Sequence, residues 1–384
     1  MPFPSRRSER SCAANCAIHC GKGDRSMTNR DSAKKRTRSL VRRMATGVTL
    51  AAALCMSMAS PAVAEPAAQN DTANVECRDV RVPVTFIGGS GHIAGTLCVP
   101  QGAKTVQLLV HGYSYARYYW DFPYQPETYS YVRRANEAGY ATLAIDRIGD
   151  GESTHPPGAT LTWDTAARTV QQVVTALRDG SLGRSFDKVV LVGHSYGSVT
   201  SYLVAGRYHD VDAMIVTGIA HRVNLADLTA RLIAQSPPAV LDPKFAKSGY
   251  DPLYVTTRKG ARSLFYNTDN ADPKVVEIDE ELKQTAGVLE IPTAAVYLLN
   301  DVSKTTNIPV LTVNGDADTF FCGPLAADCS SDEALAAFER PFYGPNAKVE
   351  AMVIPNGGHD INLELTAPQA YDRMIEFADK YVGA

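Results

Sequence analysis

The stretch that decides the fold is DKVVLVGHSYGSVTSYLVAG, residues 187–206. The continuously apolar run 189–192 is typical of a strand that is covered on both faces. Residues 202–205 then fit one side of a helix. Between them lies Gly193-His194-Ser195-Tyr196-Gly197, a G-x-S-x-G pentapeptide. Because that motif is weak by itself, the rest of the chain must show whether Ser195 has the partners it would need.

Segments typical of strands and of helices alternate along the rest of the chain. Two apolar segments flank Gly88-Gly89-Ser90-Gly91, so they predict an antiparallel hairpin. The alternation predicts an α/β fold with a doubly wound, mostly parallel sheet and this hairpin at its leading edge. Ligands bind such sheets at the carboxyl ends of the strands. The further predicted strands are 78–87, 92–100, 105–112, 140–146, 211–218, 308–315 and 348–358, and the further predicted helices lie around 127–138, 165–180 and 370–382.

Residues 219–305 interrupt this alternation. They are polar, contain Pro237-Pro238 and carry the charged run EIDEELK at 277–283. We expect a helix-rich insertion that forms a cap over the carboxyl ends of the strands.

With these segments in place, residues 78–384 outside the insertion resemble the α/β-hydrolase superfamily. The resemblance rests on the order of the strands, the GHSYG pentapeptide, NGDADTFF at 314–321 and NGGHDINLE at 356–364. It implies an α/β-hydrolase fold with an inserted helical cap, and a secreted serine esterase or lipase-like hydrolase. In this fold the catalytic serine, acid and histidine follow one another in that chain order.

The resemblance assigns a role to each of three side chains. Ser195 would be the nucleophile, held in a strained turn that requires Gly193 and Gly197 because strand and helix pass so closely there. His359 would take the serine proton, since a hydroxyl is a poor nucleophile without a base. Asp318 would orient the imidazole, as the family places this acid second in such a pair, and Asp316 is the alternative.

The same resemblance implies an oxyanion hole made of backbone N–H groups. Tyr196, at the start of the helix, would supply one donor, and Tyr113, after the strand that ends in His111-Gly112, would supply the second. The chain lacks the HGGG run of some lipases, so the tertiary-alcohol activity associated with that run has no support.

The stretch YSYARYYWDFPYQPETYSY at 113–131 is unusually aromatic. Its rings could wall an acyl or aromatic pocket beneath the cap. Equally, they could pack the cap against the core. The sequence leaves both interpretations open.

The amino-terminal 64 residues differ from the remainder in charge. They contain 12 Lys and Arg but 3 Asp and Glu, a net charge of +9, so the remainder carries −12 of the overall −3. KKRTRSLVRR at 34–43, an apolar run at 45–59 and Pro61-Ala62-Val63-Ala64 predict a secretory signal at 27–64, cleaved near Ala64. An internal apolar helix is the alternative. Residues 1–26 would be an upstream or disordered segment, and 65–384 the secreted α/β-hydrolase domain with cap insertion 219–305.

The cysteines of the secreted part predict disulfides. Cys77, Cys98, Cys322 and Cys329 form an even set in an exported chain, which allows three connectivities. Pairing Cys77 with Cys98 and Cys322 with Cys329 is the most economical, and free buried thiols are the alternative. We expect no cofactor and no metal, because the secreted part shows neither a phosphate-binding glycine motif nor metal-ligand spacing.

These observations predict a secreted serine hydrolase that cleaves carboxylic esters through a Ser-His-Asp triad and an acyl-enzyme intermediate. An exported peptidase or amidase with the same triad is the alternative, which an acidic anchor for a peptide amine would favour. A non-catalytic binding protein on the same fold is a third. The expected partner is a small-molecule ester or peptide-like substrate. The acidic body argues against nucleic acid, no stable membrane anchor is expected, and nothing in the sequence indicates an oligomeric state.

Overall fold

The computed structural model describes residues 74–298 and 301–384. The predicted upstream segment 1–26 and signal 27–64 lie outside the described residues. In the part of the chain that the structure describes, every helix is too short or too polar to span a lipid bilayer.

A mostly parallel sheet of eight strands forms the centre, in the order β1-β2-β4-β3-β5-β6-β9-β10. The hairpin of β1 and β2 occupies one edge, as predicted, and β2 pairs antiparallel with β4. From β4 to β10 all pairings are parallel. The strands span Val75–Phe86 (β1), Gly89–Pro100 (β2), Thr105–Val110 (β3), Ala141–Ile145 (β4), Lys188–His194 (β5), Ala213–Thr217 (β6), Pro309–Gly315 (β9) and Lys348–Ile354 (β10).

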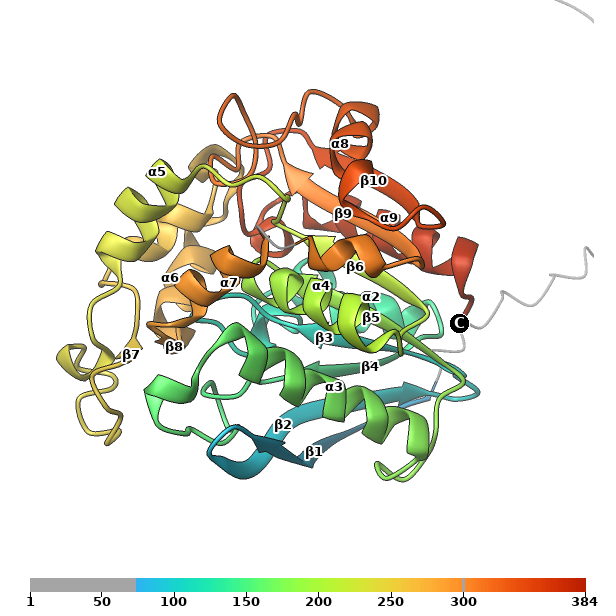
Figure 1. The fold of residues 1–384 in the computed structure, drawn as a ribbon, viewed down its shortest axis with the longest axis horizontal. Coiled ribbons are helices and arrows are strands. Elements are labelled where there is room, and N and C mark those ends of the chain that lie inside the picture. The colour runs from blue at the N-terminus through green and yellow to red at the C-terminus, as the bar shows by residue number, and fades with distance from the viewer. Residues whose placement is uncertain (1–73, 299–300) are drawn as a thin grey trace, which may run out of the picture. The chain divides into compact units, whose positions relative to one another are not determined.

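Helices cover both faces of this sheet. Figure 1 shows α3 (Trp163–Asp179) and α4 (Tyr196–Tyr208) in front of the strands, with α2 (Tyr131–Glu137) and α9 (Ala367–Tyr381) behind them. Every residue of β3, β4 and β6 is buried because helices lie on both sides of these strands. β1 instead alternates buried and exposed residues, as expected of an edge strand with one face exposed to solvent. The doubly wound α/β prediction is therefore confirmed.

Helix ends follow the sequence signals. The Thr162 side chain caps α3 by accepting the N–H of Thr165, and Gly180 ends the helix at a φ of 80°. The predicted helix around 127–138 is two helices, α1 (Pro126–Tyr129) and α2, which meet at Ser130. Ser130 adopts an extended conformation and caps α2 by accepting the N–H of Arg133. A further helix, α8 (Asp332–Glu339), packs against β10 and had no counterpart in the sequence prediction.

The chain between β6 and β9 lies beyond the carboxyl ends of the strands, at the left of Figure 1. We refer to residues 219–305 as the cap. It holds α5 (Leu225–Asp227), α6 (Pro273–Leu282), α7 (Glu290–Leu298) and a two-stranded ribbon of β7 (Tyr254–Val255) and β8 (Ala286–Gly287).

The cap contains less regular helix than the sequence suggested. Much of it is single turns, and prolines and glycines such as Pro237, Pro238, Gly249 and Gly260 lie between them. A π-helical turn spans Leu228–Leu232, and 3-10 turns of the described chain span Arg117–Tyr119, Gly158–Thr160, Ile233–Gln235, Ala239–Leu241, Ala261–Phe265, Thr268–Asn270, Val302–Thr305, Arg340–Phe342 and Ile361–Leu363.

Two cysteine pairs lie at disulfide bonding distance. Cys77 joins Cys98 across the register of β1 and β2, and Cys322 joins Cys329 within the loop that follows β9. This is the most economical of the three connectivities that the sequence allowed.

Candidate active site

Ser195 occupies the sharp turn between β5 and α4. Its backbone angles, φ 50° and ψ −117°, lie in a region that side-chain-bearing residues rarely adopt. Such strain persists where the surrounding structure enforces it, often at functional sites. The chain reverses direction at this serine, directly between the carboxyl end of β5 and the first residue of α4.

The two flanking glycines are a steric requirement of this turn. A Cβ at Gly193 would lie 2.6 Å from the carbonyl oxygen of Gly197, and one at Gly197 would lie 2.1 Å from the carbonyl oxygen of Val110. No side-chain carbon can occupy either position unless the backbone moves. The glycines therefore allow α4 to start directly against β3 and β5.

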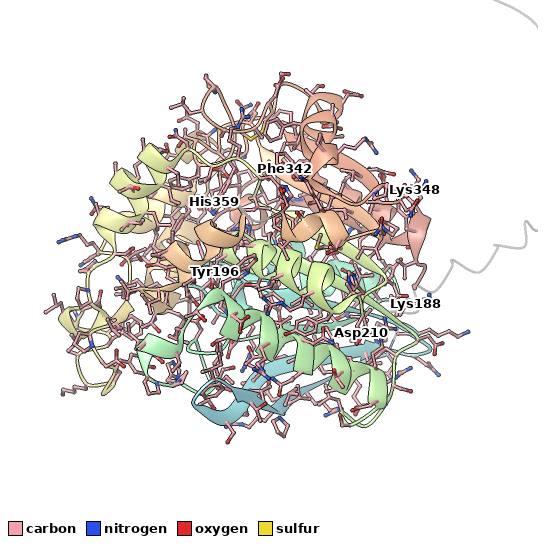
Figure 2. All side chains as sticks on the ribbon, in the orientation of Figure 1. Lys188, Tyr196, Asp210, Phe342, Lys348 and His359 are labelled. Atoms are coloured by element: carbon pink, nitrogen blue, oxygen red, sulfur yellow. A yellow bond between two sulfur atoms is a disulfide. The ribbon has the colours of Figure 1, made fainter. Side chains whose placement is uncertain are left out.

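Three side chains from distant parts of the sequence meet at Ser195. The Ser195 hydroxyl donates to Nε2 of His359 over 2.8 Å. Nδ1–H of the same ring donates to Oδ2 of Asp318, also over 2.8 Å. The carboxylate can only accept, so it fixes the proton on Nδ1 and leaves Nε2 free to take the serine proton. Figure 2 labels His359 and Tyr196 on the cap side of the sheet, opposite Lys188 and Lys348, which begin β5 and β10.

The acid of this arrangement is Asp318 and not Asp316. Asp318 is 2% exposed, whereas Asp316 points to solvent in the same turn. The second oxygen of Asp318 accepts the N–H of Phe320, which holds the carboxylate in place. Burial alone would lower the pKa of His359. The Asp318 carboxylate and its hydrogen bond outweigh that effect, so the pKa lies above its usual value of 6.5.

The loop that carries His359 is tied to the cap through Glu364. Its carboxylate accepts the N–H groups of Gly358 and of Asn267, each over 2.7 Å. Asn267 belongs to the cap. The His359 loop, which follows β10, is thus hydrogen-bonded through Glu364 to the cap segment at Asn267.

The predicted oxyanion donors lie beside the nucleophile. Tyr196 is the first residue of α4, where an N–H has no acceptor within its own helix. Gly112 directly precedes Tyr113, and a Cβ at Gly112 would lie 3.1 Å from Cβ of Ser195. Both backbone segments therefore lie next to Ser195, and their role as oxyanion donors stays a prediction.

An apolar cavity opens at Ser195 and His359. Its volume is about 70 Å³. Core residues form one side and cap residues the other. Its further lining consists of Tyr113, Tyr196, Val199, Ile219, Val223, Leu225, Leu228, Leu232, Ile291, Ala294, Phe320 and Phe321. This is the type of wall that binds small molecules with large apolar parts.

The aromatic stretch 113–131 contributes mainly to packing. Tyr113 lines the cavity. Six other rings are almost fully buried in the core, namely Tyr115, Tyr119, Trp120, Phe122, Tyr129 and Tyr131. The hydroxyls of Tyr115 and Tyr118 donate to Asp279 of the cap over 3.0 and 3.1 Å. Tyr113 thus fits the pocket interpretation, Tyr115 and Tyr118 fit the packing of the cap against the core, and the other rings pack within the core.

A buried ion pair inside the cap, which the sequence did not reveal, packs against Tyr115 of the core. Arg262 donates from Nε and Nη2 to the two oxygens of Asp279, and neither side chain is exposed. Tyr115 lies between Asp279 and Asp360, the residue after His359, and contacts both carboxyl groups. Burial, followed by the nearby Asp279, raises the pKa of Asp360 well above its usual value. Asp279 lies in the charged run 277–283, which resembles a solvated face, and the run gave no sign of burial.

A second buried ion pair joins the core to the cap beside Tyr196. Arg147, 1% exposed, donates to Glu290 at the start of α7 over 2.8 Å and to Asp150 over 2.9 Å. Its guanidinium also lies 4.6 Å from the centre of the Tyr196 ring. The Arg147–Glu290 pair thus joins the core to the cap by a charged contact, whereas the Arg262–Asp279 pair lies within the cap and is linked to the core by the Tyr115 and Tyr118 hydroxyls.

The structure holds a second serine, histidine and acid in hydrogen-bonded order. His221 Nδ1 lies 2.6 Å from Glu339 and Nε2 lies 2.7 Å from Ser303 Oγ. Ser303 is 2% exposed, and the His221 ring is stacked against Phe342 and Tyr202. This group is packed inside the protein, whereas Ser195 opens into a cavity. Hydrogen-bond order alone therefore does not identify an active site.

Other buried histidines have structural partners. His111 Nε2 accepts the N–H of Arg147 over 2.9 Å, and His194 contacts Thr217 and Asp360. Burial lowers the pKa of both rings well below 6.5. Among the described residues, no group of three or more His, Cys, Asp or Glu is arranged to hold a metal ion.

Comparisons with known proteins agree with the fold. Residues 107–374 match the model of the Alpha/beta hydrolase family. No curated protein matches the chain.

Several solved structures are similar in fold. DcsB, solved in complex with its substrate analogue, is 18% identical, with 79% of this chain and 100% of that chain covered and a TM-score of 0.54. Naproxen esterase (carboxylesterase NP) from Bacillus subtilis is 15% identical, with 79% and 92% covered and a TM-score of 0.52. The alpha/beta hydrolase GrgF from Penicillium sp. sh18 is 16% identical, with 80% and 100% covered and a TM-score of 0.51.

At these identities the solved structures show a shared fold. The family model adds more, because it spans most of the chain, including Ser195, Asp318 and His359. This protein therefore belongs to the alpha/beta hydrolase family.

Proposed function

We propose that this hydrolase is a secreted serine hydrolase that cleaves carboxylic esters through an acyl-enzyme intermediate on Ser195. The observation that carries the proposal is the hydrogen-bonded series from Asp318 through His359 to Ser195, which ends in an apolar cavity. A serine hydroxyl with a base at 2.8 Å, itself oriented by a carboxylate, is the arrangement that nucleophilic acyl transfer requires.

The proposed reaction begins with attack by Ser195. His359 Nε2 takes the hydroxyl proton while Oγ forms a bond to the carbonyl carbon, and the carbonyl electron pair moves to oxygen. The N–H groups of Tyr113 and Tyr196 would stabilise that oxyanion. When the carbonyl reforms, the bond to the alcohol oxygen breaks and His359 returns its proton to the departing alcohol. Water then repeats the sequence and releases the acid and the free serine.

The peptidase or amidase alternative uses the same triad. The sequence analysis tied it to an acidic anchor for a peptide amine. Among the described residues, the cavity lining includes no Asp or Glu. Two acids of the cap are instead engaged by buried arginines, Asp279 by Arg262 and Glu290 by Arg147. This distribution of charge supports ester over peptide substrates.

We further propose that the protein is exported, with a signal at 27–64 cleaved near Ala64 and a single α/β-hydrolase domain at 65–384 that carries the cap. The two disulfide pairs support this, since disulfides persist in oxidising compartments. The proposed partner is a small-molecule ester and not nucleic acid, in keeping with the acidic body.

Ester turnover by the purified protein tests the function. We expect a chromogenic ester to give a burst of alcohol equal to the enzyme concentration when deacylation is slower than acylation. Ser195→Ala should remove the turnover, and undiminished turnover by that variant would refute the proposal. A matched pair of ester and amino-acid anilide then separates the alternatives, because a peptidase would prefer the anilide.

A further inference from the structure

We infer that the cavity at Ser195 receives the acyl part of the substrate, and that this acyl group is an uncharged apolar chain. The inference rests on the proposed function and adds the substrate class. Apart from Ser195 and His359, every lining residue is aliphatic or aromatic. A chain of methylene groups or an apolar ring would replace water against such a wall and gain from the hydrophobic effect.

The charged groups around the cavity are already paired. Arg147 is held by Glu290 and Asp150, while Arg262 is held by Asp279, and all five side chains are buried. Arg231 near Phe320 contacts Asp227 and Thr319. A charge on the acyl chain would therefore lose water without gaining an unpaired opposite charge, which is strongly unfavourable.

The order of bond breaking assigns the cavity to the acyl group and not to the alcohol. After the first half of the reaction the acyl group stays bonded to Ser195, while the alcohol must leave and water must enter. A cavity lined by side chains of both core and cap suits the part that stays. Val199 and Phe321 belong to its core side, and Ile291 and Ala294 belong to its cap side.

The cap presents apolar side chains to this cavity through its π-helical turn, Leu228–Leu232. Leu228 and Leu232 both line the cavity, whereas the next residue, Ile233, is 43% exposed and lies outside the lining. Short π-helical segments are frequent at functional sites. Leu228 and Ile233 thus form a matched pair, one facing the substrate and one facing solvent.

An acyl series on the unmodified protein is the first test. We expect kcat/KM to rise by a factor of about four for each methylene from acetyl upward, until the cavity is filled. 6-Aminohexanoyl ester, similar in length to heptanoyl ester but positively charged, should react at least about a hundredfold more slowly than heptanoyl ester. Equal rates for acetyl and heptanoyl esters, a preference for the charged chain, or a dependence on alcohol length in place of acyl length would overturn the inference.

A charge placed in the wall is the second test. Leu228 is half-buried, so an aspartate there can keep some water. Leu228→Asp should lower the preference for heptanoyl over 6-aminohexanoyl ester at least about tenfold, and Ile233→Asp should leave it unchanged. An unchanged preference in folded Leu228→Asp would contradict the inference. Because the acyl series uses the unmodified chain, a variant that does not fold leaves that series to decide.

Failure of the inference can be told from failure of the proposed function. If all esters react through Ser195 at rates that do not depend on the acyl chain, the serine esterase proposal stands and the apolar acyl pocket is wrong. If no ester reacts, the proposed function itself is wrong.

Discussion

At the scale of single residues, the sequence identified the side chains that meet at the site but not those that support them. Ser195, Asp318 and His359 stood in motifs next to strand ends, so their positions could be predicted from local patterns. The roles of Asp279 and Asp360 could not be predicted in this way. Their carboxyl groups meet at the Tyr115 hydroxyl only through tertiary packing. A buried carboxylate in a charged run has the same sequence signature as a solvated one.

Asp318 and Asp316 provide a matched pair for the role of the acid. Asp318→Asn should lower kcat by about 10³- to 10⁴-fold, because an amide can donate to Nδ1 and favour the tautomer with a protonated Nε2. Asp316→Asn, in the same turn but exposed, should retain close to full activity. Ester hydrolysis at saturating substrate measures both. Equal losses in the two variants would argue against Asp318 as the orienting acid.

The raised pKa of His359 fixes the direction of the pH dependence. The imidazole must be neutral to accept the serine proton, so kcat/KM should fall as the pH falls through its pKa, with a midpoint above 6.5. The pairing of the imidazolium with Asp318 stabilises the folded state. This contribution to the free energy of unfolding is fully present below pH 6.5 and is lost as the pH rises through the pKa of His359 in the folded protein. In Asp318→Asn the midpoint should move to lower pH. A midpoint well below 6.5 in the unmodified protein would contradict this electrostatic account.

At the scale of elements, the core of the fold followed from sequence and the cap did not. The strand and helix that flank Ser195 appear as β5 and α4, because a buried parallel strand leaves a continuous apolar run. In the cap, Pro and Gly break the chain into turns whose conformation depends on contacts with the core. α8 was missed even though Ser331 caps it by accepting the N–H of Ala334, with Asp332 and Glu333 in its first turn. That capping pattern was available in the sequence.

The ion pair between α7 and the core should contribute strongly to stability. Glu290→Ala leaves Arg147 buried with one of its two carboxylate partners, which should lower the free energy of unfolding by about 3–5 kcal/mol. The exposed pair of Arg133 and Glu137, 3.0 Å apart, is the control, and Glu137→Ala should cost less than about 1 kcal/mol. Urea denaturation of the two variants compares them. Similar midpoints for both would show that the cap is not held by Arg147.

At the scale of the whole domain, function depends on how the sheet is wound. Parallel strands place their carboxyl ends at one edge, so residues far apart in sequence meet there, and Figure 1 shows the cap beyond that edge. The β1 and β2 hairpin, with its Cys77–Cys98 bond, lies at one edge of the sheet and is separated by β4 and β3 from β5, which leads into Ser195. The meeting of these residues at one edge could be predicted, because each of them follows a predicted strand of a parallel sheet. The cavity wall could not be predicted, because half of it comes from the cap and depends on how the cap packs on the core.

The Cys77–Cys98 bond should therefore affect stability and not catalysis. Removing both sulfurs in a Cys77→Ala, Cys98→Ala variant frees a loop of about 20 residues in the unfolded chain, which should lower the free energy of unfolding by roughly 3 kcal/mol. kcat/KM at a temperature where the variant is folded should match that of the unmodified protein. Thermal unfolding and ester hydrolysis measured on one sample check both statements. A large loss of kcat/KM in the folded variant would show that the edge hairpin influences the site.

The most direct measurement is to map the serine that a fluorophosphonate modifies in the purified protein. The hydroxyls of Ser195 and Ser303 lie 2.8 and 2.7 Å from Nε2 of a histidine that is itself paired with an acid. A fluorophosphonate reacts only with a serine hydroxyl that is both activated and accessible. The account predicts one adduct per chain, on the peptide that carries Ser195, lost in Ser195→Ala and retained in Ser303→Ala. An unlabelled protein, as expected of a non-catalytic binding protein, or an adduct that persists in Ser195→Ala, would contradict it.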